Sequence, residues 1–221
     1  METSGRVRSS PARIVAISGS LRAASSNAAL LRAAARLAPE RVRVIVQEDL
    51  GRLPHFNPDL DADGAIAPAP VAAFRSLLAS ADAVLICTPE YAHGVPGALK
   101  DALDWIVSSG ELNGKPVGLI VVAPSGGAWV RSSLMRTLHV MEARIVPDAS
   151  LTMRNTHQAL DAQGNALGAF EREMRRILAA LAAAAKPSRT TAVPGGREPK
   201  RAVALNLADR IEPPVSRGSR P

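Results

Sequence analysis

Short apolar runs alternate along most of the chain with longer runs in which apolar residues recur at helical spacing. Most of the short runs are rich in Val and Ile, which is typical of strands that are buried on both faces. The sequence predicts five strands, at residues 14–17, 41–47, 83–87, 117–122 and 145–151. It also predicts five helices, at residues 27–38, 71–80, within 88–108, 129–143 and 169–185.

The order of these elements indicates the fold class. Strands that alternate with helices form a parallel sheet that helices cover on both faces. The order predicts an α/β fold of the flavodoxin type, a doubly wound five-stranded parallel sheet with strand order 2-1-3-4-5. Such a sheet binds its ligand outside the carboxyl ends of its strands, where the strand order reverses.

The composition changes at both ends of this pattern. Residues 1–12 contain arginines but no apolar segment of the kind that a signal peptide needs, and they are predicted to form a flexible N-terminal segment. Residues 186–221 are rich in Pro, Arg, Thr and Gly and are predicted to form a disordered basic tail. One domain is therefore predicted at residues 13–185.

The overall composition fits a globular protein with an aliphatic core. Apolar residues make up 47% of the 221 residues but aromatic residues only 3%, so Ala, Val, Leu and Ile must build the core. The longest apolar run, residues 117–123, is too short to span a membrane. The single cysteine excludes an intramolecular disulfide, and the four histidines lack the spacing of metal ligands. A cytoplasmic location follows as the expectation.

The net charge of +7 raises the question of nucleic-acid binding. Eight basic and three acidic residues lie at or beyond Lys186, which leaves about +2 for the rest of the chain. No stretch combines basic residues with aromatic residues for base stacking, and no nucleic-acid motif is present. We therefore expect no specific nucleic-acid partner, and a weak attraction of the tail to polyanions remains the alternative.

Polar residues concentrate in the loop after the first strand, residues 18–27. Gly19 allows a sharp turn there, and Arg22 offers a positive charge and a planar set of donors. Further donors are Ser20, Ser25 and Asn27. Together with the free N–H groups of the next helix, these groups suit a phosphate monoester. The alternative is an ordinary turn in which Ser26 or Asn27 caps the helix, although a cap needs only one polar residue.

Two further loops have unusual composition, and they follow the third and fourth strands. The loop at residues 88–97 holds two prolines and two glycines around Glu90 and Tyr91. Such an irregular backbone can present N–H groups to the edge of a flat ligand. The loop at residues 123–128 contains two consecutive glycines, which allow close backbone approach. A flavodoxin-type sheet brings these loops and the first one together at one edge.

Together the three loops resemble the NAD(P)H-dependent FMN reductase family, a flavodoxin-like group that includes quinone, chromate and azo-dye reductases. The resemblance spans about residues 13–184, and its most specific parts are Gly19-Ser20-Leu21-Arg22 and Pro89-Glu90-Tyr91 with Pro96-Gly97. It implies that the FMN phosphate is held by Ser20, Arg22, Ser25 and Asn27. It implies that the isoalloxazine ring is lined by Pro89, Glu90, Tyr91, Ala92 and His93 and faced by Ser125, Gly126 and Gly127.

This sequence departs from the family at one position of the second loop. The family usually has Asn where this chain has Ala92. A side-chain amide contact to the ring is therefore absent, which bears on ring affinity and on the choice of acceptor, while backbone contacts remain. Outside the loops, Trp105 is interpreted as a packing residue or a subunit contact and Cys87 as a buried packing residue. Trp129, beside the third loop, is interpreted as a wall of the acceptor pocket.

The resemblance implies an oxidoreductase in which bound FMN carries the chemistry and no catalytic side chain is needed. Hydride passes from NAD(P)H, with NADPH favoured, to a small-molecule acceptor such as a quinone, a flavin, chromate or an azo dye. The chain has no dinucleotide fingerprint for a second site, so both substrates use one flavin face by a ping-pong mechanism. The family implies a homodimer or homotetramer. The alternatives are a flavodoxin-like electron carrier, although such carriers are usually acidic, and a non-catalytic binding module.

Overall fold

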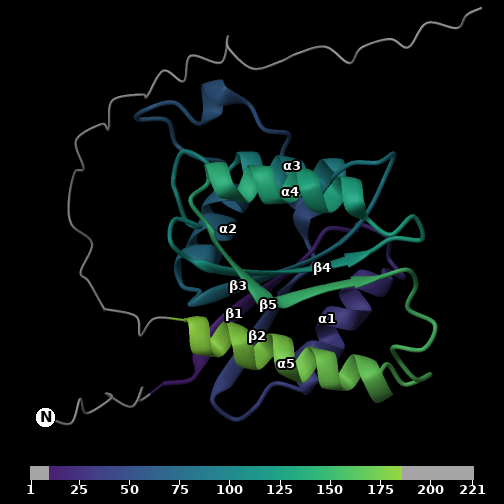
Figure 1. Ribbon diagram of the computed structural model, residues 1–221. Helices are drawn as coiled ribbons and strands as arrows, with labels where there is room; N and C mark the ends of the chain where they lie inside the picture. The colour runs from purple at the N-terminus through teal and green to yellow at the C-terminus, as the bar shows by residue number, and fades with distance from the viewer. Residues whose placement is uncertain (1–9, 186–221) are drawn as a thin grey trace, which may run out of the picture. The chain divides into compact units, whose positions relative to one another are not determined.

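The computed structural model describes residues 10–185, and these form one five-stranded parallel sheet between two layers of helices (Figure 1). The strand order is β2-β1-β3-β4-β5, so the predicted fold class and order are confirmed. The strands are β1 (Ala12–Ser18), β2 (Val42–Gln47), β3 (Ala83–Pro89), β4 (Pro116–Val122) and β5 (Arg144–Met153). The helices are α1 (Ser26–Arg36), α2 (Ala69–Ala79), α3 (Gly97–Asp104), α4 (Ala128–Val140) and α5 (Gly168–Ala184).

The core consists of two apolar layers, one on each face of the sheet. Helices α2, α3 and α4 cover one face, and α1 and α5 cover the other (Figure 1). Strands β3 and β4 lie in the middle of the sheet and are buried along almost their whole length. Because both of their faces meet a helical layer, their sequences are nearly continuous apolar runs. The edge strand β5 is more exposed, and it mixes polar with apolar residues.

The observed elements differ from the predicted ones mainly at their ends. Helix α4 ends at Val140, whereas the apolar pattern predicted a helix as far as Ala143. Glu142 has a left-handed backbone with φ of 55°. The N–H of Glu142 donates to the carbonyl of His139 at 3.0 Å, and the N–H of Ala143 donates to that of Leu138 at 3.0 Å. These two hydrogen bonds end α4 at Val140, although the apolar pattern continues to Ala143.

The long segment between β2 and α2 is ordered, with two 3-10 turns, η1 (Leu50–Arg52) and η2 (Pro58–Leu60). It packs against the end of α3 through Trp105, which is fully buried. The indole N–H of Trp105 donates to the carbonyl of Pro54 at 2.8 Å, and its ring meets Phe56 edge to face at 5.1 Å. Of the two interpretations of Trp105, packing is therefore the right one.

The domain boundaries are described only in part. Strand β1 begins at Ala12, one residue before the predicted domain start. The predicted flexible segment lies outside the described residues except for residues 10–12, and the predicted tail at residues 186–221 lies wholly outside them. None of the helices between residues 10 and 185 has the length and apolar character that a membrane crossing requires.

Candidate functional site

The three loops singled out in the sequence follow β1, β3 and β4, which are neighbours in the sheet. All three strands are parallel, with Ser18 opposite Cys87 and Pro89 opposite Val122. Their carboxyl ends therefore share one edge, and the β1–α1, β3–α3 and β4–α4 loops lie next to one another there. The expectation that the fold brings these loops together is confirmed.

The β1–α1 loop leaves the sheet through a tightly packed glycine. The N–H of Gly19 donates to the carbonyl of Cys87 at 2.8 Å, which extends the ladder by one residue. A Cβ on Gly19 would lie 2.7 Å from Oγ1 of Thr88 and 3.1 Å from Cδ2 of Leu99. Glycine is therefore required here by the close approach of β3 and α3, and the turn that follows is fixed in place.

The polar residues of this loop differ in exposure. Ser20, Ser25 and Asn27 are each about 95% buried, whereas Arg22 is exposed. Ser25 has an extended backbone, and its Oγ accepts a hydrogen bond from the N–H of Ala28 at 3.2 Å. Ser25 is therefore the N-cap of α1, and the alternative cap at Ser26 or Asn27 is wrong. The helix geometry leaves the N–H groups of Ser26 and Asn27 without an intrahelical acceptor, as at every helix start.

The Asn27 side chain is held by a neighbour on β3. The Cys87 Sγ lies 3.2 Å from Oδ1 of Asn27 and donates to it. Burial raises the pKa of the Cys87 thiol far above its ordinary value, so the sulfur keeps its proton and acts as a donor. Within the described chain the amide N–H groups of Asn27 donate to no other group. The interpretation of Cys87 as a buried packing residue is confirmed, with the added effect that it orients Asn27.

The β3–α3 loop turns back on itself within four residues. The N–H of Tyr91 donates to the carbonyl of Gly94 at 3.2 Å, and the N–H of Gly94 donates to that of Tyr91 at 2.8 Å. The two central residues, Ala92 and His93, both have a left-handed backbone, with φ of 48° and 56°. This is a type I′ turn, which favours Asn followed by Gly because side chains with a Cβ are strained in it. Ala92 therefore carries strain that the Asn usual in the resembled family would reduce.

Glu90 connects the second loop to the third. Its Oε1 accepts a hydrogen bond from the hydroxyl of Ser125 at 2.5 Å, and its Oε2 accepts one from the N–H of Val130 at 3.0 Å. These two donors, followed by His93 at 3.6 Å, lower the pKa of the carboxyl group, so Glu90 is ionised. Its side chain is only 3% exposed. The N-cap residue of α4 is Gly127, which has no side chain to cap the helix, and Glu90 supplies the missing acceptor from another loop.

The β4–α4 loop depends on its two glycines. Gly126 and Gly127 have φ of 94° and 68°, and a Cβ on Gly127 would lie 2.2 Å from Cγ1 of Val121. A larger residue therefore fits at Gly127 only if the Val121 side chain of β4 is displaced. The loop therefore presents bare backbone at the sheet edge beside the β3–α3 loop.

The comparisons with known proteins agree with this geometry. The sequence profile described as NADPH-dependent FMN reductase matches residues 12–158, which is more than half of the chain. The chain belongs to this family. It is 32% identical to an NAD(P)H-dependent FMN reductase of Pseudomonas aeruginosa, with 73% of this chain and 88% of the relative covered. It is 33% identical to an NADPH:quinone oxidoreductase of Arabidopsis thaliana, with 77% and 90% covered.

The fold of this FMN reductase family member also matches solved structures. FerB of Paracoccus denitrificans, described as a flavoenzyme NAD(P)H:(acceptor) oxidoreductase, superimposes with a TM-score of 0.68 at 27% identity. The match covers 78% of this chain and 96% of FerB. The family predicted from the three loops is therefore confirmed, and with it the class of oxidoreductases that use FMN and NAD(P)H.

The residues present at the three loops fit FMN. The β1–α1 loop has buried hydroxyls, an amide with free N–H groups, a free helix start and Arg22, which together suit a phosphate. The second and third loops offer irregular backbone of the kind that meets a flat ring. Among residues 10–185 there is no group of three His, Cys, Asp or Glu residues that could hold a metal ion.

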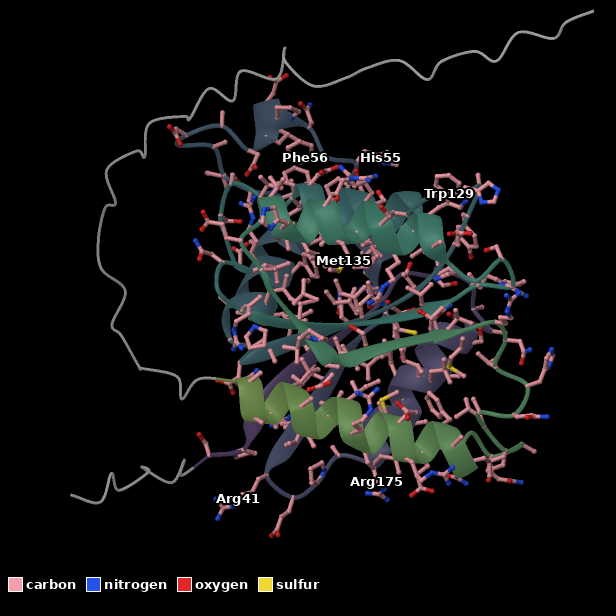
Figure 2. All side chains as sticks on the ribbon, viewed as in Figure 1. Arg41, His55, Phe56, Trp129, Met135 and Arg175 are labelled. Atoms are coloured by element: carbon pink, nitrogen blue, oxygen red, sulfur yellow. The ribbon has the colours of Figure 1, made fainter. Side chains whose placement is uncertain are left out.

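Three exposed aromatic side chains border the second and third loops. Trp129 is 63% exposed and Tyr91 is 49% exposed. The His93 ring lies against Trp129, with the ring centroids 5.9 Å apart. Figure 2 shows Trp129 at the outer end of α4, away from the core. The interpretation of Trp129 as a wall of the acceptor pocket stays a prediction.

Proposed function

We propose that the three loops hold one FMN and that the chain uses it to pass hydride from NAD(P)H to a small-molecule acceptor of the quinone class. The observation that carries the proposal is the buried donor set of the β1–α1 loop beside two loops of irregular backbone at the same sheet edge. When bound, FMN supplies the hydride-transfer chemistry.

In this proposal the β1–α1 loop binds the phosphate. Arg22 is exposed and is free to place its guanidinium beside the phosphate oxygens. Ser20 and Asn27 contribute a hydroxyl and an amide, and the first N–H groups of α1 point the same way as the helix dipole. Ser25 caps the start of α1, because its Oγ accepts a hydrogen bond from the N–H of Ala28. Its hydroxyl hydrogen remains available to the phosphate.

The second and third loops orient the ring. The N–H groups of Tyr91, Gly94 and Gly126 donate within their own loops. Those of Ala92, His93 and Gly127 donate to no group within residues 10–185, so they would be available to stabilise negative charge on a bound ring. Glu90 contributes indirectly, because its carboxylate is occupied by Ser125 and Val130 and holds the two loops together. Pro89 limits the backbone before the turn.

Both substrates use the same open face in turn. The aromatic side chains of Tyr91, His93 and Trp129 border that face and favour flat molecules such as a nicotinamide or a quinone. Quinone-class acceptors are also supported by the relative named as an NADPH:quinone oxidoreductase. A shared face predicts parallel double-reciprocal plots of rate against NAD(P)H at several fixed quinone concentrations. Intersecting lines with a demonstrated ternary complex would contradict it.

The decisive experiment is a paired measurement on the purified full chain. Flavin absorbance in the purified protein, with the flavin released as FMN, is expected. Oxidation of NAD(P)H in the presence of menadione is then expected at many turnovers per chain. Flavin without NAD(P)H oxidation would instead identify an electron carrier, and a chain that binds no flavin would identify a binding module.

The oligomeric state and the cellular location of the protein are two further expectations. We expect a homodimer or homotetramer, the assembly that the family resemblance implies. Light scattering on the purified protein should give a mass that is two or four times the mass of one chain. A cytoplasmic location stays a prediction.

A further inference from the structure

A hollow lies beside β4, between the carboxyl end of the neighbouring strand β5 and the first turn of α5. Its volume is about 530 Å³, which is in the range of sites for small organic molecules. Its walls include Met153, Arg154, Asn155, Gln158 and Phe170. No residue of the three loops described above lines this pocket, so it is separate from the donors assigned to FMN.

Arg154 joins this pocket to the β4–α4 loop. Its Nη1 donates to the carbonyl of Pro124 at 3.2 Å, and its Nη2 lies 4.0 Å from the position that a Cβ on Gly126 would take. The side chain is exposed, and it forms no ion pair with any residue between 10 and 185. The positive charge and most of the N–H donors of this guanidinium are therefore available to a ligand. The group lies beside the β4–α4 loop, which is proposed to face the flavin ring.

The other charged group of the pocket is already compensated. Glu173 accepts hydrogen bonds from Nε and Nη2 of Arg176 at 3.0 and 2.7 Å. The remaining polar lining is neutral, from Asn155 and Gln158, and the apolar wall comes from Met153 and Phe170. A pocket with one unpaired cation, neutral amides and an apolar wall suits a flat ring that carries an anionic group.

We propose that this pocket binds the 2′-phosphoadenosine end of NADPH, with Arg154 contacting the 2′-phosphate. The inference rests on the proposed function, because a dinucleotide whose nicotinamide lies at the flavin loops must place its other end elsewhere on the surface. The planar guanidinium matches a phosphate, and the Met153–Phe170 wall accepts the adenine ring. NADH lacks the 2′-phosphate, so Arg154 selects NADPH over NADH.

The test measures binding of 2′,5′-ADP to the flavin-loaded enzyme by calorimetry, with 5′-AMP as the probe that lacks the 2′-phosphate. Arg154→Ala should weaken 2′,5′-ADP binding about tenfold, because a charge-assisted contact is lost, and should leave 5′-AMP binding unchanged. The matched control is Arg41→Ala, which removes the same charge just before β2, at the opposite edge of the sheet (Figure 2). The control should bind both probes within twofold of the wild type.

A kinetic measurement and a second variant test the pocket assignment independently of calorimetry on Arg154→Ala. Arg154→Ala should raise the KM for NADPH about tenfold and leave the KM for NADH and kcat unchanged. Ala169 is exposed in the first turn of α5 and lines the pocket, so Ala169→Trp should block it and weaken binding of both probes. Normal binding of both probes by the Ala169→Trp protein would overturn the proposal.

The failure of this inference is distinct from failure of the proposed function. If the enzyme oxidises NADPH but binds 2′,5′-ADP equally well with and without Arg154, the pocket assignment is wrong and the flavin assignment stands. If the purified chain carries no flavin and oxidises no NADPH, the proposed function is wrong. In that case the same calorimetric comparison of Arg154→Ala with Arg41→Ala, made on the flavin-free chain as purified, still decides whether the pocket binds 2′,5′-ADP.

Discussion

The β1–α1 and β3–α3 loops are the two halves of the proposed FMN site, and they are built by different means. The first loop contains no residue at positive φ, and its polar side chains Ser20, Ser25 and Asn27 are buried where a ligand would meet them. The second loop exposes the side chains of Tyr91, Ala92 and His93, and it places the last two of these consecutive non-glycine residues in the left-handed region. In the proposed site, one half therefore offers a ligand the chemistry of its side chains, and the other offers the shape of its backbone.

This difference determines how substitutions act. In the first loop, we expect the removal of one donor or charge to weaken ligand binding directly. In the second loop, a substitution acts through strain in the turn or through the groups that support it, chiefly Glu90. The β4–α4 loop belongs with the second loop, since Gly126 and Gly127 also act through backbone shape.

The largest expected effect comes from Gly127→Ala. The added Cβ would lie 2.2 Å from Cγ1 of Val121, and φ of 68° is strained for alanine. We expect the free energy of unfolding to fall by about 3 kcal/mol or more, as measured by urea denaturation. The matched control is Gly114→Ala, where φ is 65° and a Cβ would meet nothing within 4 Å. The control should lose only about 1–2 kcal/mol of the free energy of unfolding. Equal losses in the two variants would show that the contact of the added Cβ with Val121 is unimportant.

Arg22→Ala tests the side-chain half of the comparison. We expect FMN binding to weaken by roughly 10- to 100-fold, since a charge-assisted contact worth about 1.5–3 kcal/mol is lost. Riboflavin lacks the phosphate and should bind the wild type and the variant equally. Fluorescence titration of the protein with each flavin measures both affinities. Equal loss of riboflavin and FMN would mean that the β1–α1 loop does not hold the phosphate.

Glu90→Gln tests the backbone half. One of the two donors, Ser125 or Val130, would then face an amide N–H₂ in place of an oxygen, so the two loops would separate. FMN and riboflavin should therefore weaken by a similar factor, roughly tenfold, in contrast to Arg22→Ala. Loss of FMN alone would refute the assignment of Glu90 to the ring side of the site.

The pH dependence of stability gives an independent check on Glu90. The pKa of Glu90 is lowered below its ordinary value of 4.5, first by Ser125 and then by Val130. Its ionised form therefore stabilises the folded protein above the pKa of the unfolded chain, and this contribution is lost as the pH falls through the lowered pKa. Below about pH 4.5 the wild type should lose stability more steeply than Glu90→Gln, as followed by urea denaturation at several pH values. Parallel curves would contradict an ionised, hydrogen-bonded Glu90.

The smallest expected effect is a gain in stability at Ala92. Asn tolerates the left-handed region better than Ala, so Ala92→Asn should stabilise the fold by about 0.5–1 kcal/mol. Ala92→Gly removes the same strain without adding an amide, although its more flexible unfolded chain offsets part of the gain. Thermal unfolding should rank Asn above Gly and Gly above Ala. If only Ala92→Asn binds flavin more tightly, the amide contacts the ring; if both variants do, relief of strain is the cause.

Much of the site was predictable from residue types. Hydroxyls, an arginine and a glycine that follow an apolar strand point to an anion whatever the details of the turn, and that inference needed only the loop sequence. The N-cap of α1 was predicted at the wrong residue, because Ser25, Ser26 and Asn27 are all residue types that cap helices well. Only the extended backbone of Ser25 and its hydrogen bond from Ala28 identify it as the cap. The pairing of Glu90 with Ser125 and Val130 left no signal in the sequence, since the partners lie 35 and 40 residues away.

The sequence by itself determined the strand order, the two helical layers and the three loops at one edge of the sheet. These follow from local periodicity and from the general rules of parallel sheets, which need no knowledge of particular contacts. Only the tertiary structure decided the type I′ turn at Ala92 and His93, the bridge made by Glu90 and the place of Arg154 beside Pro124. The Glu90 bridge and the place of Arg154 depend on contacts between segments far apart in the chain, and such contacts are set by the packing of the whole domain. The turn is local and is closed by hydrogen bonds between Tyr91 and Gly94, but Ala and His at its centre lack the Asn-Gly pair that marks a type I′ turn in a sequence.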